Sequence, residues 1–431
     1  MDLTQQSADE LAGTAEAVRQ TYDRLRGRNL ALDMTRGKPG PDQLDLADGI
    51  LTIVGAGETD GAGGDDYRNY GLLAGIPEAR AFFADYMGVS AEEVVVGGNS
   101  SLNLMYDAIS GAMLHGMPGG NASWNDQVKD GGPIKFICPV PGYDRHFAIC
   151  ERLGIEMITV DMTPDGPDMD AVEVLVADDA SVKGIWCVPK YSNPSGEVYA
   201  DAVVDRLATM PVAAPDFRVI WDNAYAVHHL GDGPATVKNL LDACKQAGDA
   251  DRVLMFGSTS KITHAGAGIA VLAASETNVA DALKKLFYAN IGFDKINQLR
   301  HLRFFGDQAG LLAHMDKQAA LIGPKFAAVD AALEQHLGGK GIATWKKPKG
   351  GYFVSVDVLD GCAADVIRLA GEAGVKLTPA GSTWPHGNDP HDRNIRLAPT
   401  FPGIAEVEQA MEVFCACVEM ACVAKLQGGA T

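Results

Sequence analysis

Seven short apolar runs between residues 94 and 275 constrain the fold of this chain more than any other feature. They are rich in β-branched residues, and helix-like stretches separate them. Continuous runs of this kind are typical of strands that are buried on both faces, so we expect an α/β fold with a mostly parallel sheet between layers of helices. The runs are VVVGG from Val94, IKFICPV from Ile134, IEMITVD from Ile155, GIWCVP from Gly184, RVIWDN from Arg218, RVLMFGS from Arg252 and GIAVLAAS from Gly268.

Helical patterns flank this central region on both sides. Residues 8–27 have apolar positions at helical spacing and end at a glycine. A long helical stretch from Ile296 to about His336 leads to GGYFVSVDV, VKLTPAG and IRLAP, and a final helix is expected around Glu406 to Gln427. We therefore expect three parts: an N-terminal arm with part of a small domain (1–55), a large domain (56–300) and a small α+β C-terminal domain (301–431).

The composition excludes several classes of function. The chain has 36 basic and 56 acidic residues, a net charge of −20, which disfavours nucleic acid and anionic membranes as partners. Eight scattered cysteines without a C-x-x-C pair predict neither a zinc site nor a disulfide framework. No metal site is expected, because the histidines lack a second ligand set. With no signal peptide pattern and no apolar run of about 18 residues, we expect a cytoplasmic protein.

Lys261 is the leading candidate for a nucleophile. It lies in GSTSKITHAGAGIA, at the exit of an expected strand and among small and hydroxyl residues. An amine in such a segment suits covalent catalysis, and the hydroxyls of Ser258 and Ser260 suit phosphate oxygens. The alternative is an exposed surface lysine, which the low charge of the segment disfavours.

Asp222 gives this lysine a chemical context. It follows the apolar residues RVIW, where an ionised carboxylate needs a partner. The protonated ring nitrogen of pyridoxal phosphate supplies such a partner, and the ion pair keeps the ring able to withdraw electrons. Tyr225 and Asn193 are placed to reach the phenolic oxygen of the same ring. The alternative for Asp222 is a helix N-cap.

Two further loops follow expected strands. The turn GGNSS lies between a strand and an apolar helix, where backbone N–H groups bind phosphate. The run CPVPGYDRHF offers Tyr143 to stack on a planar ring, with His146 three residues on. Taken singly, each also fits a structural role: a glycine-rich turn, a packed loop aromatic and a buried histidine with its own partners.

In order, the motifs are Tyr70, GGNSS, PGYDRH, NPSG, DNAY, SxSK and IRL, over about residues 30–400. This order resembles the fold-type I pyridoxal-phosphate-dependent aminotransferases of the class I aspartate aminotransferase type. The resemblance implies that Lys261 binds the cofactor covalently and moves a proton between substrate and cofactor. It implies that Asp222 pairs with the pyridine nitrogen, with His146 behind it, and that Asn193 and Tyr225 bind the phenolic oxygen.

The same resemblance implies the remaining contacts. Tyr143 is similar to the aromatic residue that stacks on the ring. Tyr70 is similar to the residue that reaches the phosphate of the neighbouring subunit in a homodimer. Arg396 is similar to the arginine that binds the substrate α-carboxylate, beside Gly37 and Asn193.

One position departs from the family pattern. Typical members have a phosphate-binding arginine eight residues after the lysine, where this chain has Ile269. The phosphate contacts then fall to Ser100, Ser101, Ser258, Ser260, backbone amides and His264. A smaller subgroup with the segment SKITxAGAG is most similar to this chain. The group that binds a second substrate carboxylate stays open among Lys295, Arg300, Arg303, Arg36, Lys38 and Asn99.

The favoured activity is transamination of L-aspartate with 2-oxoglutarate, which gives oxaloacetate and L-glutamate. Another amino-acid transaminase is one alternative, and a pyridoxal-phosphate-dependent lyase or synthase is a second. A non-catalytic regulator built on an aminotransferase-like domain is a third, which the acidic composition disfavours.

Overall fold

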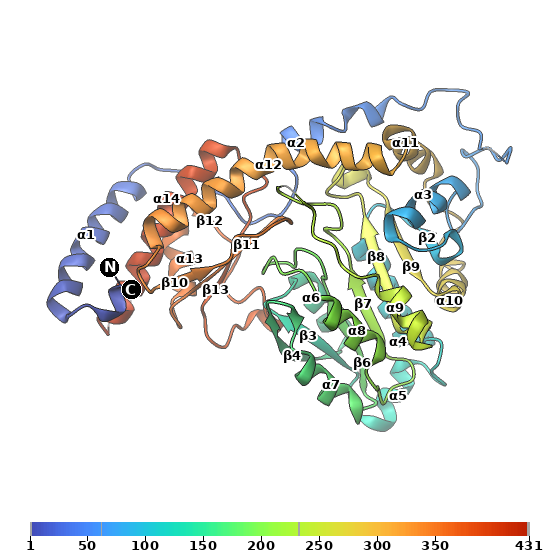
Figure 1. The fold of residues 1–431 in the computed structure, drawn as a ribbon, viewed down its shortest axis with the longest axis horizontal. Helices are drawn as coiled ribbons and strands as arrows, with labels where there is room; N and C mark the ends of the chain where they lie inside the picture. The colour runs from blue at the N-terminus through green and yellow to red at the C-terminus, as the bar shows by residue number, and fades with distance from the viewer. Residues whose placement is uncertain (1, 62, 232, 429–431) are drawn as a thin grey trace.

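The computed structural model describes residues 2–61, 63–231 and 233–428 of the chain. The described residues gather around separate hydrophobic cores, two of them on the faces of a central sheet and a further large one among the N- and C-terminal segments. In Figure 1, the sheet and the helices that cover it lie on the right, and the N- and C-terminal segments lie on the left. The division of the chain at residues 55 and 300 stays a prediction.

The central sheet has the predicted α/β character. Its strands lie in the order β2-β9-β8-β7-β6-β3-β4-β5. Neighbours from β8 to β4 pair in parallel, whereas β9 is antiparallel to both β8 and β2, and β5 is antiparallel to β4. The strands are β2 (Val94–Val96), β3 (Lys135–Val140), β4 (Glu156–Thr163), β5 (Gly166–Pro167), β6 (Val182–Cys187), β7 (Arg218–Asp222), β8 (Val253–Ser258) and β9 (Ala270–Ala274).

Helices cover both faces of this sheet because successive strand residues point to opposite faces. Trp221 packs with the helices of one face, and its neighbour Ile220 packs with those of the other. The first face is covered by α3 (Pro77–Met87), α7 (Met169–Ala177), α8 (Asp201–Thr209) and α9 (Leu240–Ala247). The second face is covered by α4 (Ser101–His115), α5 (Trp124–Gly131), α6 (Asp144–Leu153) and α10 (Glu276–Leu286).

The helical stretch predicted from Ile296 to about His336 is present, but it consists of two helices. These are α11 (Lys295–Phe305) and α12 (Gln308–Leu337). Gly306 has a positive φ of 74°, and the side chain of Asp307 accepts a hydrogen bond from the N–H of Gly310, so one helix ends and a new one begins. Gly306 and Asp307 carry the sequence signals of this break, a helix-ending glycine followed by an N-cap aspartate.

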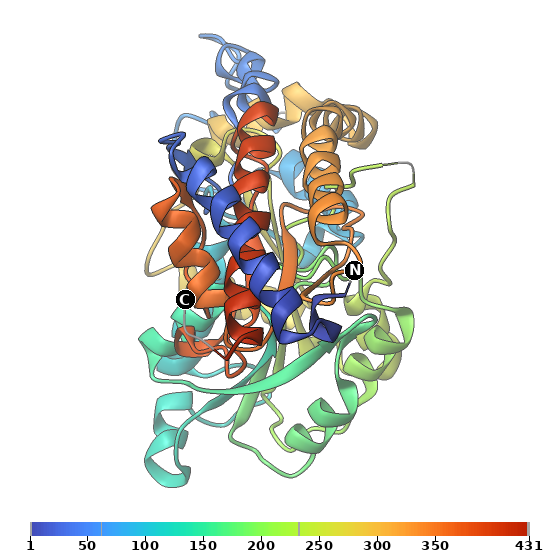
Figure 2. The ribbon, with the colours of Figure 1, turned by 90° about the vertical axis from the view of Figure 1, so that its left-hand side faces the viewer.

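The N- and C-terminal segments together form a further hydrophobic core, the terminal core. In Figure 2, α1 and α14 run beside each other, and the long α12 extends from this core toward the sheet. The N-terminal elements are α1 (Ala8–Arg26), β1 (Leu32–Asp33) and α2 (Pro41–Asp45). The C-terminal elements are β10 (Ala343–Trp345), β11 (Val354–Val358), α13 (Ala363–Glu372), β12 (Val375–Lys376), β13 (Asn394–Leu397) and α14 (Ile404–Leu426).

The sheet brings the predicted motifs to one edge. The parallel strands β3, β6, β7 and β8 end at that edge, and ligands in open α/β sheets bind just beyond it. β13 and the segment around Gly37 approach the same edge from the terminal core, since their residues line the cavity found there.

Candidate active site

A cavity of about 540 Å³ lies where the sheet edge meets the terminal core. Most residues predicted to bind cofactor or substrate line it. His146 and Tyr70 do not: His146 lies behind Asp222, and Tyr70 is 82% exposed, away from the cavity. The predicted residues in the lining are Gly37, Ser100, Ser101, Tyr143, Asn193, Asp222, Tyr225, Ser258, Ser260, Lys261 and Arg396.

Asp222 is the last residue of β7. Its carboxylate is buried, and only one of the two oxygens has a hydrogen-bond partner among the described residues. Its Oδ2 lies 3.0 Å from Nε2 of the buried His146. Its Oδ1 has no hydrogen-bond partner among the described residues. The His146 ring stacks on Trp186, with ring centroids 4.3 Å apart and planes at 9°. One carboxylate oxygen is therefore fixed from behind, and the other is available to a cationic N–H.

Lys261 follows the end of β8 and extends into the same cavity. Burial lowers the pKa of its amine, and the charge of Asp222 opposes that effect. The Nζ lies 4.9 Å from the ring centroid of Tyr225. Burial raises the pKa of Tyr225 well above its usual range, so its hydroxyl keeps its proton and remains a donor. A neutral amine is the form that attacks a carbonyl carbon.

The main chain at Lys261 is held by buried donors that the sequence did not indicate. The carbonyl oxygen of Lys261 accepts a hydrogen bond from Tyr352 Oη at 3.2 Å and lies 3.3 Å from His228 Nε2. The next carbonyl, that of Ile262, contacts His314 Nε2 at 2.7 Å. Burial lowers the pKa of His228 to about 3, so this imidazole stays neutral. These contacts fix the direction in which the lysine side chain leaves the backbone.

Arg396 in β13 presents its guanidinium to the cavity from the opposite side. Its Nη1 donates to Asp144 Oδ1 at 3.0 Å and to Asn193 Oδ1 at 3.3 Å. The guanidinium carbon lies 4.8 Å from the ring centroid of Phe353. A Cβ at Gly37 would lie 2.2 Å from the end of the Phe353 ring, so any larger residue would force this ring to move. Asp144 is inside the motif PGYDRH, but its partner cannot be read from the sequence.

The expected phosphate end of the cavity has hydroxyls and a helix N-terminus. Ser100 is the N-cap residue of α4, and the N-terminal N–H groups of a helix attract anions. Ser260 Oγ donates to the carbonyl of Asn99 at 2.8 Å. Ile269 is buried and contributes no charge. His264, proposed from the sequence as a further donor, does not line the cavity, and its Nε2 lies 3.4 Å from Asp48.

The structure narrows the candidates for binding a second carboxylate. Arg36 and Lys38 line the cavity. The others do not: Lys295 donates to the carbonyl of Gly71, and Arg303 pairs with Glu58. Arg300 and Asn99 are also absent from the lining. Arg145, which the sequence did not suggest for this role, is present in it.

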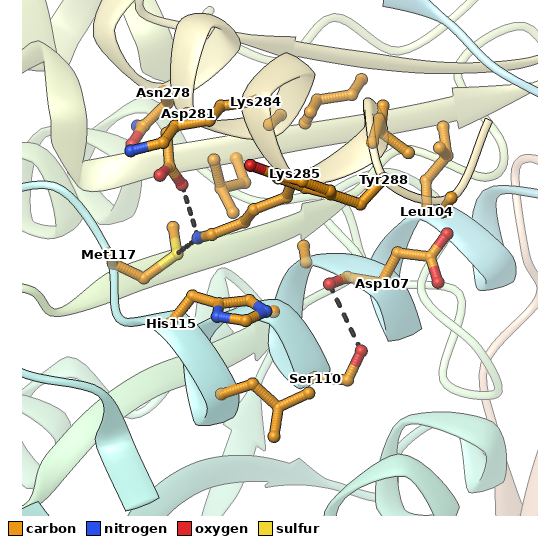
Figure 3. Close-up of a pocket in the computed structure, with 18 residues that line it drawn as sticks. Leu104, Asp107, Ser110, His115, Met117, Asn278, Asp281, Lys284, Lys285 and Tyr288 are labelled. Atoms are coloured by element: carbon orange, nitrogen blue, oxygen red, sulfur yellow. Dashed lines mark hydrogen bonds and ion pairs between the residues drawn. The ribbon is translucent and has the colours of Figure 1, made fainter. Parts of the chain in front are cut away.

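A second hollow of about 770 Å³ lies apart from the predicted site, between α4 and α10 (Figure 3). Its walls include Leu104 and His115 from α4 and Lys285 from α10. Lys285 Nζ lies 2.6 Å from Asp281 and 3.7 Å from the sulfur of Met117. Because none of the predicted site residues line it, this hollow is not part of the candidate active site.

No group of three or more His, Cys, Asp or Glu side chains in the described ranges is arranged to hold a metal ion. Within those ranges, none of the helices combines the length and the apolar character that crossing a membrane requires.

Known proteins are similar to this chain in sequence and in fold. The sequence model of the family described as aspartate amino-transferase matches residues 6–430. An aspartate aminotransferase of Corynebacterium glutamicum is 47% identical over 406 residues, which cover 94% of this chain and 93% of that protein. The crystal structure of an aspartate transaminase from Corynebacterium glutamicum has a TM-score of 0.96 at 45% identity and covers 99% of both chains.

A more distant structure shares the fold alone. It is LysN, the α-aminoadipate aminotransferase of Thermus thermophilus, complexed with N-(5'-phosphopyridoxyl)-L-leucine. Its TM-score is 0.73 at 20% identity, covering 97% of this chain and 96% of that one. Fold, family match and close relatives agree: the chain is a fold-type I aminotransferase and belongs to the aspartate aminotransferase family.

Proposed function

We propose that this aminotransferase uses pyridoxal phosphate to transfer the amino group of L-aspartate to 2-oxoglutarate. The observation that carries the cofactor assignment is the buried Asp222, whose Oδ1 has no partner among the described residues and which shares a cavity with the amine of Lys261. A buried carboxylate of this kind needs a cationic hydrogen-bond donor, which a protonated pyridine ring provides.

The lining residues fit the cofactor at each of its functional groups. Asp222 would bind the ring nitrogen, Lys261 would hold the cofactor by a covalent bond, and the ring of Tyr143 would stack on its face. Asn193 and Tyr225 would bind its phenolic oxygen. The phosphate would be bound by Ser100, Ser101, Ser258 and Ser260 with the N-terminal N–H groups of α4. When bound, pyridoxal phosphate supplies an electron sink for the negative charge that develops at the substrate α-carbon.

The protein residues have separate tasks in this reaction. Arg396 binds the substrate α-carboxylate through its planar guanidinium, which the Phe353 ring and Asn193 orient. Lys261 Nζ accepts the proton from the substrate α-carbon, and burial keeps more of this amine neutral than in water. The pair of His146 and Asp222 would keep the ring nitrogen of a bound cofactor protonated, since a neighbouring carboxylate favours the charged form of a base.

The charge of the cavity supports a dicarboxylic substrate. The described lining residues include the cations Arg36, Lys38, Arg145 and Arg396 against two acidic residues. Those two are already engaged, one with Arg396 and one with His146. In a chain of net charge −20, such a cavity attracts anions that the rest of the surface repels. The relatives named for aspartate support the same substrate.

We also propose a homodimer in which Tyr70 reaches the neighbouring active site. Large apolar side chains lie exposed at Tyr70, Leu114, Phe287, Tyr288 and Ile291, and burying such side chains against another chain is favourable. Tyr288 and Leu114 border the second hollow between α4 and α10 (Figure 3). A second copy of the chain would cover them. A cytoplasmic location is proposed because the cysteines are free and buried.

A donor panel tests the substrate assignment. With 2-oxoglutarate held at one saturating concentration, kcat/KM is measured for L-aspartate, L-alanine and L-phenylalanine. L-aspartate should give the highest value because it alone offers a second carboxylate to the cavity cations. A higher value for alanine or phenylalanine would show that the aspartate assignment is wrong, although the protein would remain an aminotransferase.

A further inference from the structure

Besides Lys261 and Arg396, the cavity lining has three residues with cationic side chains, Arg36, Lys38 and Arg145. Lys38 and Arg36 each have a neighbouring side chain. Lys38 Nζ lies 3.9 Å from the ring centroid of Phe401. Arg36 lies close to Asp33: burial opposes ionisation of that carboxyl, while hydrogen bonds from Thr35 and the charge of Arg36 lower its pKa. Among the residues that the structure describes, none of these three side chains forms a hydrogen bond or an ion pair, so all three cations are available to a ligand.

Arg145 also stands where a helix disfavours it. Tyr143 is the N-cap of α6, so Arg145 is the second residue of the helix. The N-terminus is the positive end of the helix dipole and disfavours cations. Asp144 would offset this charge, but its Oδ1 contacts Arg396 Nη1 at 3.0 Å. Residues that break a local rule without a local gain are expected at functional sites.

Arg145 and Arg396 place two guanidinium groups in the lining of one cavity, and a substrate with two carboxylates needs two such partners. Burial raises the pKa of the Tyr143 hydroxyl, and the charges of Arg145 and Arg396 each oppose this rise. Tyr143, Arg145 and Arg396 all line the same cavity. Asp144, which contacts Arg396, is the chain neighbour of Arg145.

We propose that Arg145 determines specificity by binding the side-chain carboxylate of aspartate, glutamate and their 2-oxo acids, while Arg396 binds the α-carboxylate. The inference rests on the proposed function, since it refines how that site selects its substrate. A guanidinium suits the task because its planar fork binds a carboxylate through two parallel hydrogen bonds. An apolar side chain such as that of alanine gives Arg145 nothing to bind.

The test is the half-reaction of the cofactor-loaded enzyme with a single amino acid, followed by absorbance. Arg145→Gln should lower the second-order rate constant for aspartate by about 10- to 100-fold, and that for alanine by less than about 3-fold. Calorimetric titration with maleate, an unreactive dicarboxylate, should show a similar rise in its Kd. Arg145 is exposed, so the variant should fold.

Two variants control for the change of charge. Arg152→Gln removes the same charge from the exposed last turn of α6, outside the cavity, and should leave both rate constants unchanged. Arg36→Gln removes it from inside the cavity and should change the aspartate-to-alanine ratio by less than about 3-fold.

The outcomes separate the inference from the proposed function. Equal losses for aspartate and alanine in Arg145→Gln would overturn the inference, as would loss of the aspartate preference in Arg36→Gln but not in Arg145→Gln. In both cases the wild-type preference for aspartate would stand. If the wild-type enzyme itself prefers alanine, the proposed substrate fails, and Arg145 loses its assigned role with it.

Discussion

Replacing Asp222 with asparagine should separate catalysis from stability. The amide has almost the same size but no charge. In the cofactor-free protein, the wild-type carboxylate is buried, with Oδ2 at 3.0 Å from His146 and Oδ1 unpartnered among the described residues. An unsatisfied buried polar group costs about 1–3 kcal/mol when neutral and more when charged, so the amide is the cheaper group to bury here. Without cofactor, the Asp222→Asn protein should therefore be as stable as the wild type or more stable.

Catalysis should change in the opposite direction. With pyridoxal phosphate bound, the variant leaves the protonated ring nitrogen without its buried counter-charge. Breaking one partner of a buried ion pair costs about 3–5 kcal/mol. At about 1.4 kcal/mol for each factor of ten, the loss in kcat/KM is roughly 150- to 5,000-fold. Asp222 should thus lower the stability of the cofactor-free protein and raise the catalytic rate of the cofactor-loaded enzyme.

Two measurements check this prediction. Calorimetry of the cofactor-free proteins gives the difference in Tm, and steady-state kinetics with saturating pyridoxal phosphate gives kcat/KM for aspartate. Asn193→Ala serves as the matched comparison, and it should lose only about tenfold because Tyr225 still donates to the same phenolic oxygen. Equal and small kinetic losses for the two variants would refute the reasoning, and so would a marked fall in the Tm of cofactor-free Asp222→Asn.

Three further predictions follow from the site. Arg396→Lys should raise KM and lower kcat/KM for every amino acid and 2-oxo acid, since lysine lacks the planar fork; an effect confined to aspartate would show that Arg396 binds the other carboxylate. Gly37→Ala should lower kcat/KM because its Cβ would lie 2.2 Å from the Phe353 ring, and Phe353→Leu should restore part of the loss if this clash is the cause. Burial lowers the pKa of His228 from 6.5 to about 3, so the folded protein binds fewer protons than the unfolded chain between these values. The stability that depends on this group is therefore complete above pH 6.5, and it declines by about 1.4 kcal/mol per pH unit as the pH falls toward 3. Urea unfolding at several pH values should give a smaller slope for His228→Gln than for the wild type. An equal slope in the variant would contradict this.

The sequence predicted the sheet, and most of the residues that line the cavity, for physical reasons. Strands buried on both faces are continuously apolar, and the carboxyl ends of parallel strands meet at one edge, so Asp222 and Lys261 were expected near each other. Contacts between distant segments leave no local pattern. The hydrogen bond from Tyr352 to the Lys261 carbonyl and the ion pair of Asp144 with Arg396 are of this kind. For the same reason, the sequence did not indicate which cations would line the cavity.

Mixing the cofactor-loaded enzyme with L-aspartate alone tests the central claim most directly. An aminotransferase keeps the amino group, so each active site should release one oxaloacetate and then stop until 2-oxoglutarate is added. Lys261→Ala should not complete this single turnover at the wild-type rate, because no amine remains to accept the α-proton. Oxaloacetate and the amount of active sites are measured in the same sample. Continued product release without a 2-oxo acid would show a lyase, and absence of any oxaloacetate would contradict transamination of aspartate.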